Sequence, residues 1–536
     1  MQKTFLLILI CLLGTGCAAD GETAEETGPV LLEEDAPAWQ KYAGEPVSFD
    51  WYINYSWFAA DWGENIVSQK ITEETGVSLR FITPGGNESE KLNALIAADS
   101  LPDFITLGWW EPQINEMIDR DMVYALNTLA DAYDPYFYQV SDADAVSWYT
   151  QEDGNVYSYP NSSYSAKDLE EHDNIGSNQT FLVRKDIYEA IGSPDMTTPE
   201  GFQAAVEKAY EMFPTVDGEA LIPVGAHVFN DQGNVSFDKY LMNFLAVPFE
   251  ENGKVYDRYT NEDYITWLKM FRRLGEEGLL ANDIFIDQRT QMEEKMAKGR
   301  YFCMIYQSTD MATQQKELYA NHPDRIYLAV DGPKNAAGDD HTLTTSGING
   351  WTVTLISKNC ENPERAIAFL DYLLSEQGQL RVYLGVEGET FDYVDGKAVV
   401  KEEVKAVLNS DRAEYDRLYG ADDTYWMLQD NVTQLQWKQE TAEPLRQVSE
   451  WSYPYAVYNG QYDFFLPYGS KEAFAENKIV VLWSETLPTL LLAKSEERFD
   501  EIFARFLEQR EAYGFEEVQV MKTELMEKAK EKLGMQ

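Results

Sequence analysis

The chain has 536 residues, of which 44% are hydrophobic, so it can bury a large core and is long enough for more than one domain. Acidic residues outnumber basic ones 92 to 43, and the resulting formal charge of −49 repels nucleic acid and anionic lipid surfaces. A nucleic-acid partner is therefore excluded, whereas neutral and cationic ligands stay open. The acidity itself is typical of a solvated, exported surface.

The first residues have the order of a secretory signal. A lone lysine, an apolar run over 5–13 and three small residues precede Cys17. The run is too short to span a bilayer, but cleavage before Cys17 would leave a cysteine that can carry lipid, as in the bacterial lipobox that this stretch resembles. Plain secretion with an incidental cysteine is the alternative. Residues 1–17 are predicted to be a lipoprotein signal, and the acidic residues 18–44 a flexible tether.

Globular patterning begins at residue 47, where apolar residues alternate with polar ones in the period of a strand. The predicted elements in chain order are a strand at 47–53, a helix at 65–74, a strand at 77–82, a helix at 88–98 and a strand at 104–107. Strands that alternate with helices indicate an α/β sheet with parallel members.

The same alternation continues through the rest of the chain. It predicts strands at 181–183, 221–224 and 351–356, helices beginning at Thr198-Pro199, at 260 and at 362, and a hairpin over 391–400 that turns at Asp395-Gly396. The mature chain holds only two cysteines, Cys303 and Cys360. Two are too few for a disulfide framework, and Cys303 is predicted to be a small core residue.

Aromatic residues gather where two predicted strands end. The strands at 47–53 and 104–107 lead into Asn54, Tyr55, Trp57, Trp62, Trp109 and Trp110. Ligands bind beyond the carboxyl ends of strands in open α/β sheets, so these loops predict a crevice. Aromatic faces with nearby amides and hydroxyls suit sugar rings, while a core plug is the alternative for each single tryptophan.

Signatures of catalysis and metal binding are absent from the sequence. It contains no HExxH, GxSxG, P-loop or GxGxxG pattern, and its four histidines lack ligand spacing, so neither a metal nor a cofactor is expected. Paired carboxylates for glycoside cleavage stay open, because 92 acidic residues make some pair inevitable.

Several stretches together resemble the family 1 extracellular solute-binding lipoproteins of ABC importers, which are related in fold to maltose-binding protein. They span most of the mature chain and comprise the lipobox, Trp51–Trp57 (WYINYSW), Leu101–Leu107 (LPDFITL), Phe181–Asp186 (FLVRKD), Ile356–Ala366 (ISKNCENPERA) and Tyr383–Phe391 (YLGVEGETF). The resemblance implies a two-lobed α/β fold of the periplasmic-binding-protein kind, with a hinge and an interlobe cleft. Residues 45–165 with 345–395 would form one lobe, and 166–344 with 396–536 the other.

The same resemblance implies further site residues and a function. Tyr306, Gln307 and Ser308 would line the second lobe's side of the cleft, with Trp351 near the crossing. The protein would capture a neutral oligosaccharide at the extracellular face of the bacterial cytoplasmic membrane, held there by lipid, and deliver it as a monomer to the permease of an ABC importer without breaking a bond. A surface glycan-degrading enzyme and a peptide-binding or sensing lipoprotein are the alternatives.

Overall fold

The computed structural model describes residues 37–441, 443–467 and 469–535, so Cys17 and the predicted tether up to residue 36 lie outside it. The residues from Pro37 onward form one unit, and the predicted tether boundary at residue 44 is therefore too late. Helix α1 (Ala38–Lys41) places Trp39 against Tyr372 with ring centroids 5.0 Å apart, and Trp39 is only 6% exposed. One large apolar side chain with a buried partner is enough to fix this segment.

The first sheet has the strand order β2-β1-β3-β14-β4. Its strands are β1 (Val47–Ile53), β2 (Val77–Ile82), β3 (Phe104–Gly108), β4 (Tyr159–Pro160) and β14 (Thr352–Ile356). β1 pairs in parallel with both β2 and β3, as the alternation of strands and helices predicts, while β14 runs antiparallel to β3. Side chains of β1 alternate between two core clusters, with Trp51 in one and Tyr52 in the other.

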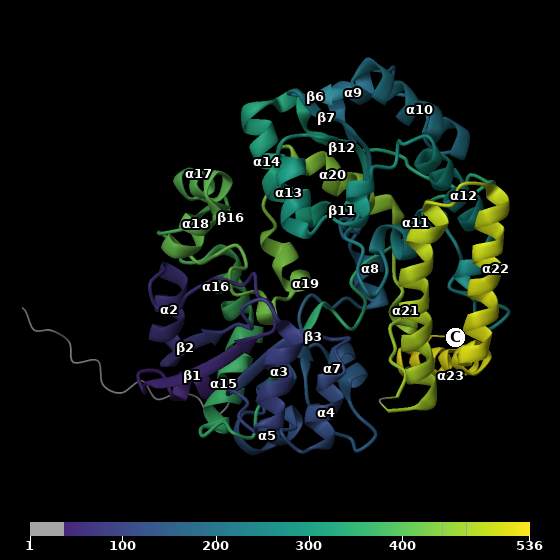
Figure 1. The fold of residues 1–536 in the computed structure, drawn as a ribbon. Helices are drawn as coiled ribbons and strands as arrows, with labels where there is room; N and C mark the ends of the chain where they lie inside the picture. The colour runs from purple at the N-terminus through teal and green to yellow at the C-terminus, as the bar shows by residue number, and fades with distance from the viewer. Residues whose placement is uncertain (1–36, 442, 468, 536) are drawn as a thin grey trace, which may run out of the picture. The chain divides into compact units, whose positions relative to one another are not determined.

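Helices cover both faces of the first sheet (Figure 1). On one face lie α2 (Ile66–Thr75), α5 (Leu126–Tyr133) and α15 (Pro363–Leu374), and on the other α3 (Glu88–Ala97) and α4 (Gln113–Asp119). Asn65 caps α2 by accepting from the backbone of Ser68, and Gly76 ends the helix in a left-handed conformation.

The second sheet has the order β12-β5-β11-β8, and its strands are β5 (Gln179–Arg184), β8 (Ile222–Gly225), β11 (Tyr301–Gln307) and β12 (Tyr327–Ala329). The helices α10 (Pro199–Met212), α12 (Glu262–Glu276), α21 (Lys471–Leu491) and α22 (Glu496–Tyr513) contribute to the core on one face. The other face carries α13 (Arg289–Ala297), α14 (Ala312–Asn321) and α20 (Leu445–Ser452). Each sheet with its helices is one lobe, so the protein has the two-lobed α/β fold expected from the sequence.

The predicted helix start at Thr198 and the predicted hairpin over 391–400 are confirmed. Thr198 caps α10 by accepting from Gly201, and Pro199 is its first residue. Strands β15 (Phe391–Val394) and β16 (Lys397–Val400) form the predicted hairpin, with positive φ at Asp395 and Gly396. Helix α12 (Glu262–Glu276) begins two residues after the predicted start at 260, because Asn261 rather than Thr260 supplies the cap.

The chain departs from the expected division between lobes after residue 396. Helices α17 (Glu402–Ser410) and α18 (Arg412–Leu418) and the turn η6 (Trp426–Leu428) carry buried side chains of the first lobe's core cluster, although residues 396–536 were all expected in the second lobe. No local pattern assigns these elements to a lobe, because many members of the core cluster that they join, such as Val67 and Phe104, lie far earlier in the chain. The other main helices are α7 (Ala143–Tyr149), α8 (Ala166–Glu171), α9 (Lys185–Ala190), α16 (Glu376–Leu384) and α23 (Phe515–Lys532).

Cys303 and Cys360 are buried free thiols, and Cys303 lies in the second lobe's core as predicted. Within the ranges that the structure describes, no helix has an apolar stretch long enough to cross a bilayer.

Candidate functional site

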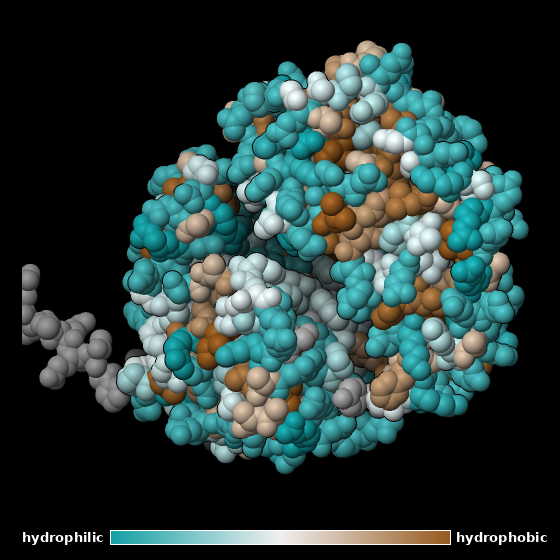
Figure 2. All heavy atoms as spheres, in the orientation of Figure 1, coloured by the Kyte–Doolittle hydropathy of each residue, from teal (hydrophilic) through white to brown (hydrophobic). Residues whose placement is uncertain are grey.

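Two adjoining hollows lie where elements of the two lobes face each other. The central hollow, of about 420 Å³, is lined by the segment 174–178, by side chains between Ser308 and Gln315 and by twelve residues between Asp423 and Tyr453. The Trp57 hollow, of about 860 Å³, is lined by residues 57–60, 309–321 and 408–424. Thr309 and Ala312 line both, so the hollows form one crevice with walls from both lobes. Figure 2 shows this face hollowed between the surface over α17 and α18 and the surface over α13 and α14.

An aromatic platform stands at the first lobe's side of this crevice. Trp57 stacks over Trp351 with nearly parallel rings, 8° apart in plane and 6.0 Å between centroids. Trp426 lies 4.6 Å from Trp351 and 5.6 Å from Trp57, and Tyr55 completes the platform at 5.3 Å from Trp351. Trp57 is its outermost member, with 57% of its surface exposed. An exposed ring held in place by other rings is a preformed apolar face.

Asn161 joins two segments that carry this platform. Its side chain donates to the carbonyl of Trp426 over 2.9 Å and accepts from the backbone of Thr352 over 2.8 Å. Its backbone carbonyl accepts from the N–H of Trp351. Two tryptophans that are distant in sequence are thus positioned by one fully buried amide.

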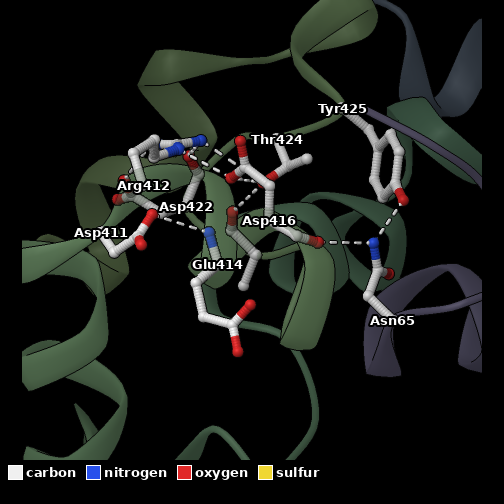
Figure 3. A network of polar contacts seen from close by, with 9 residues as sticks. Asn65, Asp411, Arg412, Glu414, Asp416, Asp422, Thr424 and Tyr425 are labelled. Carbon is white, nitrogen blue, oxygen red and sulfur yellow. Dashed lines mark hydrogen bonds and ion pairs between the residues drawn. The ribbon is translucent and has the colours of Figure 1, made fainter. Parts of the chain in front are cut away.

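A polar network fixes the turn that borders the crevice beside Trp426 (Figure 3). Arg412 donates to the carboxylates of Asp416 and Asp422 over 2.7 and 2.9 Å, and the hydroxyl of Thr424 also donates to Asp416. Asn65 of the first lobe donates to the carbonyl of Asp416 and to the hydroxyl of Tyr425. These bonds hold Asp422 and its neighbour in left-handed backbone conformations, which non-glycine residues adopt only under constraint.

Asp423, the residue after Asp422, presents its carboxyl group to the central hollow. The side-chain amides of Gln429 and Gln434 donate to its two oxygens over 2.9 and 2.8 Å. Burial, followed by the charge of Asp422, raises the pKa of Asp423 to about 8, while the bond from Gln434 opposes the shift. Asp423 is therefore protonated at neutral pH and can donate a hydrogen bond as well as accept one.

This shift predicts a pH dependence of stability. The folded chain keeps a proton on Asp423 that the unfolded chain releases above the ordinary pKa of 3.8, so more protons are bound in the folded state. The free energy of unfolding should therefore fall as pH rises from 3.8 to about 8. Asp423→Asn keeps an uncharged isostere and should flatten this part of the profile, which urea unfolding at several pH values measures. Profiles of wild type and variant with the same slope would contradict the assignment.

The crevice walls are more acidic than basic. Besides the protonated Asp423, four acidic and three basic side chains line the two hollows: Glu317, Asp411, Asp416, Asp422, Lys316, Arg412 and Lys438. With the chain's net charge of −49, this lining disfavours a polyanionic ligand. In the part of the chain that the structure describes, no group of three or more His, Cys, Asp or Glu side chains is placed to hold a metal ion.

The structure brings some of the residues predicted from sequence to the crevice. Trp57 lines the Trp57 hollow and Ser308 lines the central hollow. Tyr55 and Trp351 belong to the platform with Trp57 but line neither hollow. Gln307 is half-buried, accepts from Tyr240 and donates to Thr309.

Of three other predicted residues, Asn54 and Tyr306 are buried and Trp62 is partly buried. Asn54 is 1% exposed and its amide donates to both oxygens of Glu111 over 3.1 and 2.8 Å. Trp62 packs against Tyr425 and donates to the hydroxyl of Thr72. Tyr306 is 2% exposed and stacks on the ring of a buried histidine, His227, at 4.2 Å. A strand-end position places a side chain near an edge but leaves its direction open.

Trp109 and Trp110 line a separate hollow of about 450 Å³, the Trp110 hollow, between the first lobe and α21 and α23.

Trp426 and Asp423 were not predicted from the sequence, because neither is at a predicted strand end. Long-range packing brings Trp426 to the platform and Asp423 to the central hollow. The one local signal was the run of aromatic and acidic residues between 419 and 426.

Comparisons with known proteins agree with this architecture. Residues 67–388 match the family model described as bacterial extracellular solute-binding protein. Among curated proteins, the fructooligosaccharide ABC transporter substrate-binding protein FusA of Streptococcus pneumoniae is 23% identical over 316 residues, 56% of each chain. Lipoprotein LipO of Bacillus subtilis is 21% identical over 345 residues, 61% of this chain and 64% of that protein. The matches thus span less than two thirds of these relatives.

Solved structures share the fold at low sequence identity. FusA of S. pneumoniae in complex with kestose superposes with a TM-score of 0.67 at 16% identity, covering 90% of this chain and 99% of that one. The alginate-binding protein AlgQ2 superposes with a TM-score of 0.65 at 18% identity, covering 90% and 98%. Since the family model matches more than half of its residues, the chain belongs to the bacterial extracellular solute-binding protein family.

Proposed function

We propose that this protein is a cell-surface receptor that captures a neutral oligosaccharide between its two lobes and delivers it to an ABC importer. The observation that carries the proposal is the exposed ring of Trp57, stacked on Trp351 at the mouth of a crevice with walls from both lobes. The axial C–H faces of a sugar ring can lie on such a surface. The names of the relatives support this class of ligand, since FusA is described as a fructooligosaccharide-binding protein.

The polar groups of the crevice suit the hydroxyls that surround a stacked sugar. Gln429, Gln434 and Asn431 line the central hollow, together with the protonated carboxyl group of Asp423. Amides and a neutral carboxyl group both donate and accept, so they can satisfy hydroxyls of either polarity without burying a net charge.

The charge of the crevice walls favours a neutral ligand over an anionic one. Acidic side chains outnumber basic ones along its walls, and Arg412 is already engaged by Asp416 and Asp422. An acidic glycan would meet repulsion and no free bidentate cation in these walls. We therefore infer a neutral ligand, although AlgQ2 is described as alginate-binding.

Binding and closure need no bond breaking. Ligand that contacts Trp57 on one wall and Thr309 on the other bridges the lobes, and it favours the closed state by its higher affinity for that state. Residues 1–17 would export the chain and leave Cys17 lipidated, so that a monomeric receptor stays on the membrane close to its permease.

A thermal-shift series tests the proposal. The purified protein is heated with neutral disaccharides to hexasaccharides, with alginate oligomers and with peptides, and free reducing ends are measured in the same samples. We expect the melting temperature to rise with the concentration of a neutral sugar, as native-state binding requires, while that sugar stays intact. Release of reducing ends would identify a glycan-degrading enzyme, and stabilisation only by peptides or by alginate would overturn the neutral-sugar assignment.

A further inference from the structure

The crevice has an inner end and an outer end. The chain passes from the first sheet to the second between β4 and β5, and from the first lobe's core to the second sheet's helices between η6 and α20. Residues 174–178 of the first connection and six residues between Gln429 and Thr441 of the second line the central hollow. Of the described residues in these connections, none lines the Trp57 hollow. The central hollow is therefore the inner end, bounded by chain that joins the lobes, and the Trp57 hollow is the outer end.

One turn of the first lobe contributes to both hollows. Asp423 lines the central hollow, and its neighbours Asp422 and Thr424 line the Trp57 hollow. On the opposite wall, Thr309 and Ala312 each line both hollows. The hollows thus adjoin along both walls, so a ligand can extend from one into the other without leaving the crevice.

The carboxyl group of Asp423 is held by a chain of buried amides. Gln434 is 4% exposed and donates to Asp423 over 2.8 Å and to the amide oxygen of Gln379 over 3.1 Å. Gln379 is fully buried and donates in turn to two backbone carbonyls of the first lobe's core. Gln429 donates to the other oxygen of Asp423 over 2.9 Å. The core therefore fixes the orientation in which this carboxyl group meets a ligand, which lowers the cost of ordering it on binding.

The two hollows offer different kinds of contact. The central hollow presents amides and a carboxyl group in fixed directions, and such hydrogen bonds depend on where each sugar hydroxyl points. Its volume of about 420 Å³ lies toward the lower end of the roughly 300–1,000 Å³ of small-molecule sites, so it suits the end of a chain rather than its whole length. The Trp57 hollow presents an exposed ring, and stacking on a ring face depends little on hydroxyl stereochemistry.

We propose that the crevice holds its ligand end-on: one terminal sugar unit lies in the central hollow against the carboxyl group of Asp423, the next unit stacks on Trp57, and later units run out to solvent. This inference rests on the proposed function. It makes Asp423 the residue that selects the end unit, and it restricts the substrate to oligosaccharides with one unsubstituted end. A second unit adds the stacking contact without a second loss of translational freedom, so affinity rises with chain length and then levels off.

Labelled chains test this arrangement on the wild-type protein, so the result does not depend on the folding of any variant. Calorimetry measures the affinity for chains of one to six units of the neutral series that the thermal-shift panel identifies. It is repeated with the longest chain carrying a bulky aromatic amide on its first or on its last unit. We expect the label to weaken binding by about tenfold or more at one end and by less than about twofold at the other.

Two variants separate the two subsites. Trp57→Ala should leave the affinity for a single unit unchanged and remove most of the gain that the second unit brings. Asp423→Asn should weaken every length by about tenfold, because an amide group cannot accept from Gln429 and Gln434 at once and presents a different pattern to the end unit. Thermal melting without ligand checks that each variant is folded.

Each variant has a matched control outside the crevice. Glu111→Gln changes another carboxyl group that accepts from a buried amide, that of Asn54, but lines neither hollow of the crevice. Tyr393→Ala removes a ring that is 47% exposed on the β15–β16 hairpin and likewise lines neither hollow. Both controls should bind every chain as wild type does.

Three results would overturn end-on binding while leaving the receptor assignment intact: a label tolerated at both ends, a label equally harmful at both ends, or a Trp57→Ala loss that includes the single unit. An Asp423→Asn protein that melts normally and binds every length as wild type does would show that Asp423 does not select the end unit. Binding of no neutral sugar by wild type would instead refute the proposed function, and this inference with it.

Discussion

Trp57→Ala is expected to weaken sugar binding by about tenfold to a hundredfold, the loss typical of removing an aromatic anchor from a recognition site. The fold should be little affected, because the ring is 57% exposed in the free protein and covers only part of Trp351 and Trp426. Calorimetric titration measures the affinity, and thermal melting without ligand measures the stability of the same sample.

Trp62→Phe is the matched control for this variant. Trp62 belongs to the same loop region, but its ring packs against the first lobe's core and its indole N–H donates to Thr72. The variant keeps an aromatic ring and loses one hydrogen bond, so it should cost about 1 kcal/mol of stability and leave affinity unchanged. If Trp62→Phe weakened binding as strongly as Trp57→Ala, the platform would not be the surface that recognises the sugar.

Most of the fold was predictable because its signals are local. The period-2 pattern of Val47–Ile53 and the helix start at Thr198-Pro199 depend on neighbours within a few positions, and the structure confirms both. The parallel pairing of β1 with β2 and β3 follows from the helices between them. The sequence placed α17 and α18 in the wrong lobe, because their assignment depends on packing partners that no local pattern identifies.

The site was predictable only in part, for the same physical reason. Strand ends mark Tyr55 and Trp57 as edge residues, but the loop decides that Trp57 points outward while Asn54 turns in to Glu111. Burial of the Glu111 carboxyl group raises its pKa, and the amide of Asn54 is consumed in satisfying it. Trp426 joins the platform through the amide of Asn161, a contact between residues 265 positions apart. Such contacts leave no trace in residue spacing.

Gly350→Ala is expected to destabilise the protein by about 3 kcal/mol and to weaken sugar binding as well. Gly350 has φ of 68°, and a Cβ there would lie 1.9 Å from the carbonyl oxygen of Asn161, which accepts from Trp351. Relief of the clash must move Asn161 or Trp351, and either movement displaces the platform.

Gly338→Ala is the matched control. The φ of Gly338 is 76°, but no atom lies within 4 Å of the added carbon, so this variant should lose only about 1 kcal/mol of stability to backbone strain. Urea unfolding and calorimetry of both variants separate the two causes, and equal losses in both would show that backbone strain, not the contact with Asn161, sets the geometry of the platform.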